Sequence, residues 1–571
     1  MKVAMQGLSK VLEVDSQELL FLTYSVATGL LVGVFSLAYL GLFNTLSSVA
    51  QRLSSASVFA RAALPMVGLA TSSLVLLLLT GYARHLGTHN VIYAYHFRGG
   101  EIKARETLAD AASSILTISL GGSAGLESPG LHLGGGIGSL ASRLFRLEAG
   151  DRRRLMIAGA AAGLSAIFRA PLSGTLFALE IPYLFDIEKE VFLPALLASA
   201  ASSLVVLTLS GGETLAYPFL AQYSMTVEPL HVVLAGVASA AVGLLFVRFY
   251  KLVQSRLARL RLAQRIALGG AILGTLVALF PEVSGTGYGV IEAALRNELN
   301  ASIGLLDALL LLKIVATSLT LSSGGSGGLF IPSLYVGAVM GLAYTRLFGL
   351  DPRYTPVFMS AVLASTTKTA IMPVVFVAEL YGGGAIVPAS LASVIAYFLS
   401  GHETFYEDQL LRRPPLETYT LAEVYSILKQ QKPEVLEKYR VAEFAEKPFA
   451  ITLSTRLEQL LAIAAKREAE VFPVVTNDSK LIGYLTLTDV LSFNLSNPSL
   501  SVEALPIRRP LTVQPSEPIG SLAELMVEEC ETHAFVIDAQ GRLLGVISAD
   551  KLTEKLLPHF LSGGKGLSKA K

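Results

Sequence analysis

Apolar runs separated by short polar stretches dominate the chain up to about residue 400, and mixed patterns follow. The first run, 19–43, is too long for the apolar core of a signal peptide and predicts a retained membrane helix. Several later runs are shorter than the roughly 20 residues that a perpendicular crossing needs, which predicts tilted, broken or half-crossing helices buried within protein. These later runs lie at about 59–82, 108–120, 155–168, 171–185, 192–209, 231–249, 266–280, 303–322, 329–348, 356–380 and 384–399.

Composition favours a membrane-embedded protein over a soluble one. The chain has 571 residues, of which 52% are hydrophobic and only 16% are charged. This is too apolar for an ordinary soluble protein and too long for one domain, so we expect a multi-pass protein in a lipid bilayer. The formal net charge of +1 gives no reason to expect a nucleic-acid partner, and the single cysteine, Cys530, excludes an internal disulfide.

Two glycine-rich loops interrupt the apolar region at matching places. Residues 121–130 read GGSAGLESPG and residues 324–333 read GGSGGLFIPS, and their prolines are 203 positions apart. The same spacing pairs Glu127 with Phe330 and aligns glycines in the stretches that follow. Glycine allows close backbone approach and proline suits a first helical turn, so we expect each loop to be followed directly by a helix. The free N–H groups at such a helix start favour an anion. Paired broken-helix loops in two halves of a membrane chain indicate an ion site between repeats.

The centres of both loops resemble signature motifs of the CLC family of chloride channels and transporters. Residues 125–129, GLESP, are similar to its G(K/R)EGP motif, with Leu126 for the basic residue and Ser128 for the second glycine. Residues 328–332, GLFIP, match its GxFxP motif in full. The resemblance implies an all-α membrane domain, a CLC-type inverted repeat of broken and tilted helices. It also implies a homodimer with one pathway per subunit for chloride or a similar small anion.

The resemblance further implies a gate and a set of anion-binding positions. In the family, the glutamate that matches Glu127 occupies an anion position when deprotonated and moves away when it is protonated or displaced. A tyrosine at the position of Tyr406 donates its hydroxyl to the central chloride. The N–H groups of Phe330 and Ile331 suit conduction, because a lysine would hold the anion too tightly to release it. The implied anion-binding positions are Gly125, Leu126, Gly328, Leu329, Phe330, Ile331, Tyr406, Gly87 and Thr88.

A third family motif, GSGIP, is the poorest match. Aligning its second glycine with Gly87 places Leu86 where the family has a chloride-coordinating serine. A backbone donor or Thr88 is the local substitute, so we expect poor selectivity among chloride, nitrate and bromide. His85 and His89 nearby have the i, i+4 spacing of a metal-binding pair, but no third ligand is in sight, so we predict no metal site.

The residue after Glu180 bears on proton coupling. Coupled members of the family usually carry two consecutive glutamates here, and the second passes protons from the cytoplasm. This chain has Ile181, as channel members have an aliphatic residue. Glu180 itself should face another partner, because neighbouring helical residues point about 100° apart. We therefore expect passive or loosely coupled flux, and chloride/proton exchange through a water chain past Ile181 stays open as the alternative.

The pattern changes near residue 401, where charge rises and alternating strands and amphipathic helices begin. Residues 471–489 are echoed by residues 534–550, and each copy reads as strand, polar turn, strand and capped helix. The pair resembles a tandem CBS module, an α/β cytoplasmic appendage that is frequent in CLC proteins. The predicted parts are a membrane domain at 1–410, a linker at 411–440, CBS domains at 441–496 and 497–562, and a disordered tail at 563–571.

The CBS pair carries partial matches to the phosphate and ribose contacts of nucleotide-binding relatives. Thr486 and Asp489 fit these contacts, whereas Ser548 and Asp550 in the second copy are one residue closer together. Binding of an adenine nucleotide and a purely structural or dimerising role are therefore equally open. No other cofactor is expected.

Other functions fit the sequence less well. The fluoride-transporting relatives lack the carboxy-terminal pair and have altered loop residues. An intramembrane hydrolase needs a histidine base beside Ser123 or Ser326, and His132 near the first loop is replaced by Tyr335 in the second, which argues against a duplicated catalytic site. A nucleotide sensor with a membrane anchor leaves the two matched loops unexplained. We therefore expect a transport protein and not an enzyme.

Overall fold

In a computed structural model the chain divides into two compact units, Met1–Gln409 and Leu410–Lys571, each of which is described by itself. The structure describes residues 16–210, 228–413, 415–456, 458–461, 471–492, 501–505 and 507–561. The segment 563–571, for which we predicted a disordered tail, lies outside these residues.

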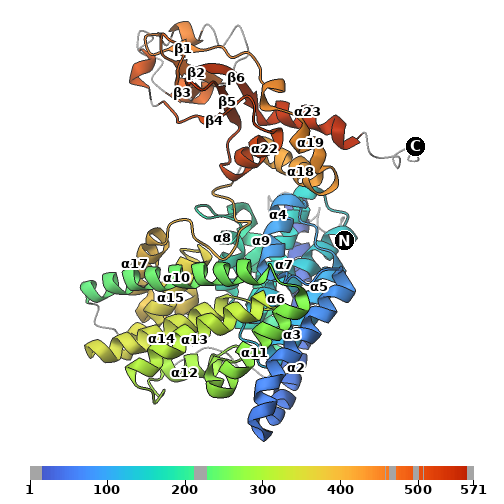
Figure 1. The fold of residues 1–571 in the computed structure, drawn as a ribbon, viewed down its shortest axis with the longest axis vertical. Helices are drawn as coiled ribbons and strands as arrows, with labels where there is room; N and C mark the ends of the chain where they lie inside the picture. The colour runs from blue at the N-terminus through green and yellow to red at the C-terminus, as the bar shows by residue number, and fades with distance from the viewer. Residues whose placement is uncertain are drawn as a thin grey trace. The chain divides into compact units, whose positions relative to one another are not determined.

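The first unit is built of α-helices joined by loops and short 3-10 turns (Figure 1). Among its described residues, seven helices are long and apolar enough to cross a membrane. The helices of the first half are α2 (Ser16–Ala56), α3 (Val58–Thr80), α4 (Gly87–Phe97), α5 (Ala104–Ser119), α6 (Glu127–Leu144), α7 (Ala149–Phe168), α8 (Pro171–Glu180) and α9 (Phe192–Leu209). Those of the second half are α10 (Pro229–Leu257), α11 (Leu262–Leu279), α12 (Tyr288–Leu295), α13 (Ile303–Ser322), α14 (Phe330–Phe348), α15 (Thr355–Thr367), α16 (Met372–Tyr381) and α17 (Ile386–Leu399). The 3-10 turns are η1 (Lys189–Val191), η3 (Pro281–Val283), η4 (Pro352–Tyr354) and η5 (Gly383–Ala385).

Most predicted apolar runs coincide with one helix each, and one expectation was wrong. The run at 356–380 is two helices, α15 and α16, because the chain turns at Lys368, whose backbone adopts a left-handed φ of 57°. The buried ammonium group of Lys368 donates to the carbonyl oxygen of Tyr397 at 2.9 Å, which holds the turn against α17. The short helices α4 and α12 were not predicted, because short helices sheltered by protein need no long apolar run.

The two halves repeat the same close helix pair. Helix α6 packs on α7 in the first half, and α14 packs on α15 in the second. Glycines that are 203 positions apart make both contacts: a β-carbon at Gly134 would lie 2.1 Å from the carbonyl oxygen of Gly159, and one at Gly337 would lie 2.6 Å from the Cα of Met359. Helices approach this closely only where a side chain is absent. The repeat predicted from the loops is therefore confirmed in the packing.

The second unit is α/β and contains two three-stranded sheets of the same design. In each sheet the first pair of strands is parallel and the second pair is antiparallel. The register repeats as well, since Val474 faces Gly483 in one sheet and Val536 faces Gly545 in the other. The predicted internal repeat is confirmed. The sheets are β1 (Ile451–Thr452), β2 (Val471–Val475) and β3 (Leu481–Thr486), and then β4 (Leu511–Val513), β5 (His533–Ile537) and β6 (Leu543–Ser548).

The second unit also contains helices, both before its first strand and between and after its strands. The segment for which we predicted a linker, 411–440, contains two of them, α18 and α19. The helical elements of this unit are α18 (Leu416–Gln431), α19 (Pro433–Lys438), η6 (Val441–Glu443), α21 (Leu487–Ser492), η7 (Val502–Ala504), α22 (Ile519–Glu528) and α23 (Ala549–Leu561).

Candidate functional site

The two glycine-rich loops meet inside the first unit. The backbones of Gly125 and Gly328 form an antiparallel bridge, with N–H to O distances of 2.9 and 2.8 Å in the two directions. Helices α6 and α14 begin two residues after this bridge, at Glu127 and Phe330. The repeat therefore joins two helix starts at one point, as the paired loops predicted.

The carboxylate of Glu127 lies on the first turn of the opposite helix. Its Oε1 accepts hydrogen bonds from the N–H of Phe330 at 2.8 Å and of Ile331 at 3.2 Å. Its Oε2 is buried and has no hydrogen-bond partner among the described residues. Free N–H groups and the helix dipole make this first turn a favourable place for an anion, so the side chain of Glu127 occupies a natural anion position.

Both bridging glycines are required by this placement. A β-carbon at Gly125 would lie 1.9 Å from Oε2 of Glu127, and a β-carbon at Gly328 would lie 2.0 Å from Oε1. Any larger residue at either position would have to displace the carboxylate. The glycines of the two motifs thus explain why the carboxylate can reach the other half of the repeat.

Phe330 serves the site through its backbone and the core through its side chain. The phenyl ring is 1% exposed and lies 5.0 Å from the ring of Phe168, 5.5 Å from that of Phe177 and 5.3 Å from that of Phe376, between ring centres. These rings come from α7, α8 and α16, so the aromatic cluster holds the start of α14 in place.

The start of α4 lies against the residue after Glu127. The N–H and the hydroxyl of Thr88 both donate to Oγ of Ser128, at 2.7 and 2.9 Å. The N–H of Gly87 donates to Oδ2 of Asp110 at 3.0 Å. The structure thus brings Gly87 and Thr88 beside the gate loop, where both use their donors within the protein.

Tyr406 lies at the same place, 3% exposed. Its ring centre is 5.3 Å from that of His89, the residue that follows Thr88 on α4. The structure therefore gathers Glu127, Tyr406 and Thr88, which the sequence had placed in three distant segments.

Two buried charges at equivalent positions of the repeat were missed from the sequence. Asp110 on α5 and Lys313 on α13 are each 0% exposed and are 203 positions apart. Asp110 accepts from Nδ1 of His132 at 2.9 Å and from the hydroxyl of Ser326 at 2.6 Å, as well as from Gly87. Lys313 donates to the carbonyl oxygen of Gly285 at 3.0 Å. A charged residue at the same point of both apolar runs was the signal that could have found them.

These bonds also bear on the hydrolase alternative. The hydroxyl of Ser326 donates to the carboxylate of Asp110, and Oγ of Ser123 lies 3.0 Å from Oγ1 of Thr317. The remaining ring nitrogen of His132 lies 2.9 Å from Nδ2 of Asn90. Neither serine is paired with a histidine base, which nucleophilic catalysis would require.

Glu180 faces the start of another helix, as expected. Its carboxylate accepts from the N–H groups of Ala370, Ile371 and Met372 at 3.0, 2.9 and 2.7 Å, and so it caps α16. Glu379 on α16 accepts from the N–H of Ser173 at 2.7 Å and caps α8 in return. Ile181 is 0% exposed and offers no titratable group.

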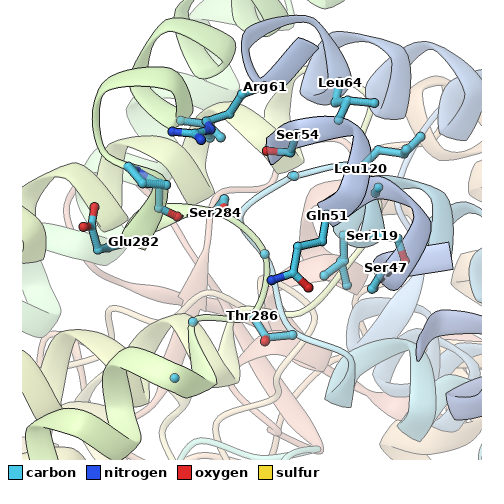
Figure 2. Close-up of a pocket in the computed structure, with 18 of the residues that line it drawn as sticks. Ser47, Gln51, Ser54, Arg61, Leu64, Ser119, Leu120, Glu282, Ser284 and Thr286 are labelled. Carbon is cyan, nitrogen blue, oxygen red and sulfur yellow. Dashed lines mark hydrogen bonds between the residues drawn. The ribbon is translucent and has the colours of Figure 1, made fainter. Parts of the chain in front are cut away.

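Two cavities lie at opposite ends of α3. A cavity of about 480 Å³ contains Arg61 near the start of this helix, and Figure 2 shows Gln51 projecting between Arg61 and Glu282 on one side and Ser119 on the other. A second cavity of about 710 Å³ contains Arg84, just after the end of α3. A helix of 23 residues is about 34 Å long, which matches the apolar thickness of a bilayer. The two cavities are therefore separated by about the apolar thickness of a bilayer along α3.

The second cavity is rich in charge. It is lined by Arg84, Arg248, Lys251, Glu403 and Glu407 together with less polar neighbours. Glu403 is paired with Arg248 at 3.4 Å and with Lys251 at 3.2 Å. One of its lining residues, Glu407, directly follows Tyr406 in the chain.

Comparison with known proteins settles the family. Residues 74–401 match the family described as "Voltage gated chloride channel". The chain belongs to the CLC family. This CLC protein is 31% identical over 334 residues to a ClcB-like chloride channel protein of Ralstonia nicotianae, a match covering 56% of this chain and 77% of the relative. It is 29% identical over 337 residues to the voltage-gated ClC-type chloride channel ClcB of Citrobacter koseri, covering 56% of this chain and 78% of the relative.

Solved CLC structures agree with the fold. A CLC-type fluoride/proton antiporter superposes with a TM-score of 0.63 at 25% identity, covering 69% of this chain and 99% of that one. A eukaryotic CLC transporter superposes with a TM-score of 0.61 at 17% identity, covering 94% of this chain and 98% of that one. The second likeness shows the fold alone. The predicted CLC membrane fold with a carboxy-terminal α/β pair is confirmed.

The second unit of the CLC protein contains two CBS domains, because residues 441–496 and 502–558 match the CBS family. In the first copy Asp489 accepts from the N–H and hydroxyl of Thr486 at 2.9 and 2.8 Å, and both its oxygens bind Arg508 at 2.7 Å. Burial tends to raise the pKa of the Asp489 carboxyl, but the bonds from Arg508 and Thr486 outweigh it and hold this pKa below its usual value.

The second CBS copy lacks this arrangement at the matching place. Oγ of Ser548 accepts from the N–H of Lys551 at 3.3 Å, and Asp550 is exposed on the first turn of α23. The two predicted nucleotide contacts are thus unequal: Asp489 is already paired within the protein, whereas Asp550 faces solvent.

Proposed function

We propose that this CLC protein transports chloride or a similar small anion through a pathway within each subunit of a homodimer, with Glu127 as its gate. The observation that carries the proposal is the Glu127 carboxylate on the N–H groups of Phe330 and Ile331, at 2.8 and 3.2 Å. A deprotonated carboxylate competes with a free anion for these donors. Protonation or displacement of the side chain leaves the donors to the anion.

The proposed pathway runs past this point between the two cavities at the ends of α3. The hydroxyl of Tyr406 and the backbone around residues 125–126 and 328–331 line its central part. The Tyr406 hydroxyl and the N–H groups of Phe330 and Ile331 contribute hydrogen-bond donors without a full positive charge, which allows the anion to leave again.

The test is anion efflux from proteoliposomes that contain the purified full chain. Chloride-loaded vesicles should release chloride faster than protein-free vesicles, and arms with bromide, nitrate and fluoride rank the anions. The fluoride arm is included because one similar structure is that of a fluoride/proton antiporter. Efflux no faster than from empty vesicles, for all four anions, would refute the proposal.

The favoured mode is passive or loosely coupled flux. Ile181 is apolar and 0% exposed, and the neighbouring carboxylate of Glu180 is engaged by three N–H groups of α16. Neither residue offers a site for proton transfer from the cytoplasmic side.

Chloride/proton antiport is the second candidate. It is favoured by a buried carboxylate close to Ile181 along the chain: Glu188 is 2% exposed and accepts from the hydroxyl of Tyr183 at 2.9 Å and from that of Tyr95. Two similar structures are also those of proton antiporters, one for fluoride and one for chloride. A chloride gradient imposed across proteoliposomes distinguishes the modes, because only antiport drives protons uphill.

For the CBS unit we propose a cytoplasmic location and an adenine-nucleotide site. The proposal rests on the family match and on the pairing of Thr486 with Asp489. Titration calorimetry of the full chain with ATP and AMP tests it. Heat of binding is expected for at least one of the two nucleotides. Absence of binding heat for both would refute the nucleotide site and favour a structural role for the CBS unit.

A further inference from the structure

The start of α4 offers three N–H groups that have no acceptor within the helix, those of Gly87, Thr88 and His89. The first is used by Asp110 at 3.0 Å and the second by Ser128 at 2.7 Å. The helix start therefore retains one donor for a ligand, and it belongs to His89.

The side chain of His89 is also poised for a ligand. Both of its ring nitrogens are buried, and neither has a hydrogen-bond partner in the part of the chain that the structure describes. A neutral imidazole has one N–H donor and one acceptor, and buried polar atoms are nearly always paired. The unpaired ring thus points to a ligand or a bound water at this place.

The neighbours of His89 locate that ligand. The ring lies between the rings of Tyr406 and His85, with centres 5.3 and 5.2 Å away. Arg84 and Glu407, which directly adjoin His85 and Tyr406 along the chain, line the charged cavity of about 710 Å³. A ligand of the His89 ring would therefore lie beside Tyr406, close in the chain to residues that line this cavity.

Leu86 explains why a histidine is needed here. It precedes the helix, its side chain is 5% exposed, and it has no donor to offer. Residues i and i+3 lie on the same side of a helical turn, so His89 is on the face that begins at Leu86. A donor lost at position 86 can be supplied from position 89.

We infer that His89 binds the transported anion through its ring N–H beside Tyr406 and helps to set anion selectivity. This inference rests on the proposed anion transport. It adds a residue of this chain to the site, and it makes the affinity for the anion depend on a donor in the imidazole ring.

The test compares anion binding and flux in matched variants of the full chain. His89→Phe keeps a ring against Tyr406 and removes both nitrogens, and His89→Gln keeps a donor. Titration calorimetry with chloride should show about tenfold weaker binding for His89→Phe and near wild-type binding for His89→Gln. The control is His231→Ala, whose ring pairs with the hydroxyl of Tyr344 at 2.9 Å, away from this site.

A double variant sharpens the test. Leu86→Ser in the His89→Phe background returns a hydroxyl to the first turn and should restore chloride binding and change the chloride-to-nitrate flux ratio. Wild-type affinity in His89→Phe, in protein that elutes as a single species, would overturn the inference. Absence of anion flux in the wild-type protein would instead refute the proposed transport, so the two failures are distinguishable.

Discussion

The two halves of the membrane unit share one scaffold and carry opposite chemistry. At the loops, the first half contributes the Glu127 carboxylate and the second half contributes the N–H groups of Phe330 and Ile331. Behind the loops, Asp110 accepts from the N–H of Gly87, whereas Lys313, its equivalent, donates to the carbonyl oxygen of Gly285. The repeat places the starts of α6 and α14 opposite each other. Because only the first half has a carboxylate at this point, the start of α14 is the one that holds it.

The CBS unit shows the same division. Its two sheets share their strand order and register, but Asp489 is paired with Arg508 while Asp550 is exposed. In both units, the backbone repeats and the charged side chains diverge. Substitutions at equivalent positions can therefore distinguish residues that both copies need for folding from residues that have a role in one copy only.

The largest difference, in the loss of stability, is expected between Asp110→Ala and Lys313→Met. Removing Asp110 leaves the N–H of Gly87, the ring of His132 and the hydroxyl of Ser326 without their acceptor, at a cost of about 3 kcal/mol or more. Lys313→Met should cost about 1 kcal/mol, because methionine fills similar space and unpaired carbonyls are tolerated better than unpaired N–H groups. Thermal unfolding in detergent measures both, and equal losses would contradict the asymmetry.

The next largest effect, on anion flux, is expected for Gly328→Ala, which should act on the gate without substituting Glu127 itself. The new β-carbon would lie 2.0 Å from Oε1 of Glu127 and should push the carboxylate off α14. Hydrogen bonds to a charged group contribute about 1.5 kcal/mol or more, so flux at neutral pH should rise roughly tenfold. Gly41→Ala, where a β-carbon meets nothing within 4 Å, is the control. An unchanged flux in Gly328→Ala would mean that the carboxylate does not block the pathway.

A smaller effect is expected for Tyr406→Phe, which removes one hydroxyl and keeps the ring against His89. The loss of one net hydrogen bond to the anion should weaken chloride binding by about 1 kcal/mol. Calorimetry measures this directly. Tyr397→Phe, whose hydroxyl donates to the carbonyl of Leu184, serves as a control that should leave the affinity unchanged.

The smallest expected effect is a difference in stability between substitutions at Asp489 in the first CBS copy and Asp550 in the second. The pKa of the Asp489 carboxyl is held below its unfolded value, so its contribution to stability is present above about pH 4 and is lost as the pH falls through the folded pKa. Asp489→Asn should reduce stability by about 0.5 kcal/mol at neutral pH and converge with wild type in acid. Hydrogen exchange of β3 and α21 in the full chain measures this, and Asp550→Asn should have no effect at any pH.

The sequence predicted those features that depend on short motifs and on repeated spacing along the chain. The loops, their partner glycines and the CBS repeat follow from motifs and equal intervals along the chain. The turn at Lys368 could not be predicted, because its left-handed backbone depends on the carbonyl of Tyr397 in a later helix.

Contacts between distant segments could not be predicted from the sequence either. Nothing in the local pattern pairs Asp110 with Ser326, or places the His89 ring on Tyr406, since each contact joins segments from opposite parts of the unit. Glu180 was expected to face another partner, but only the fold shows that this partner is the start of α16.

The most direct test of the account is chloride flux as a function of pH for Glu127→Gln in proteoliposomes. Glutamine can neither titrate nor compete as an anion for the N–H groups of Phe330 and Ile331. The account predicts that flux persists in this variant and no longer changes with pH, while Glu180→Gln, a buried carboxylate at a different helix start, keeps the wild-type response. A Glu127→Gln protein with the pH response of the wild type would contradict the assignment of Glu127 as the gate.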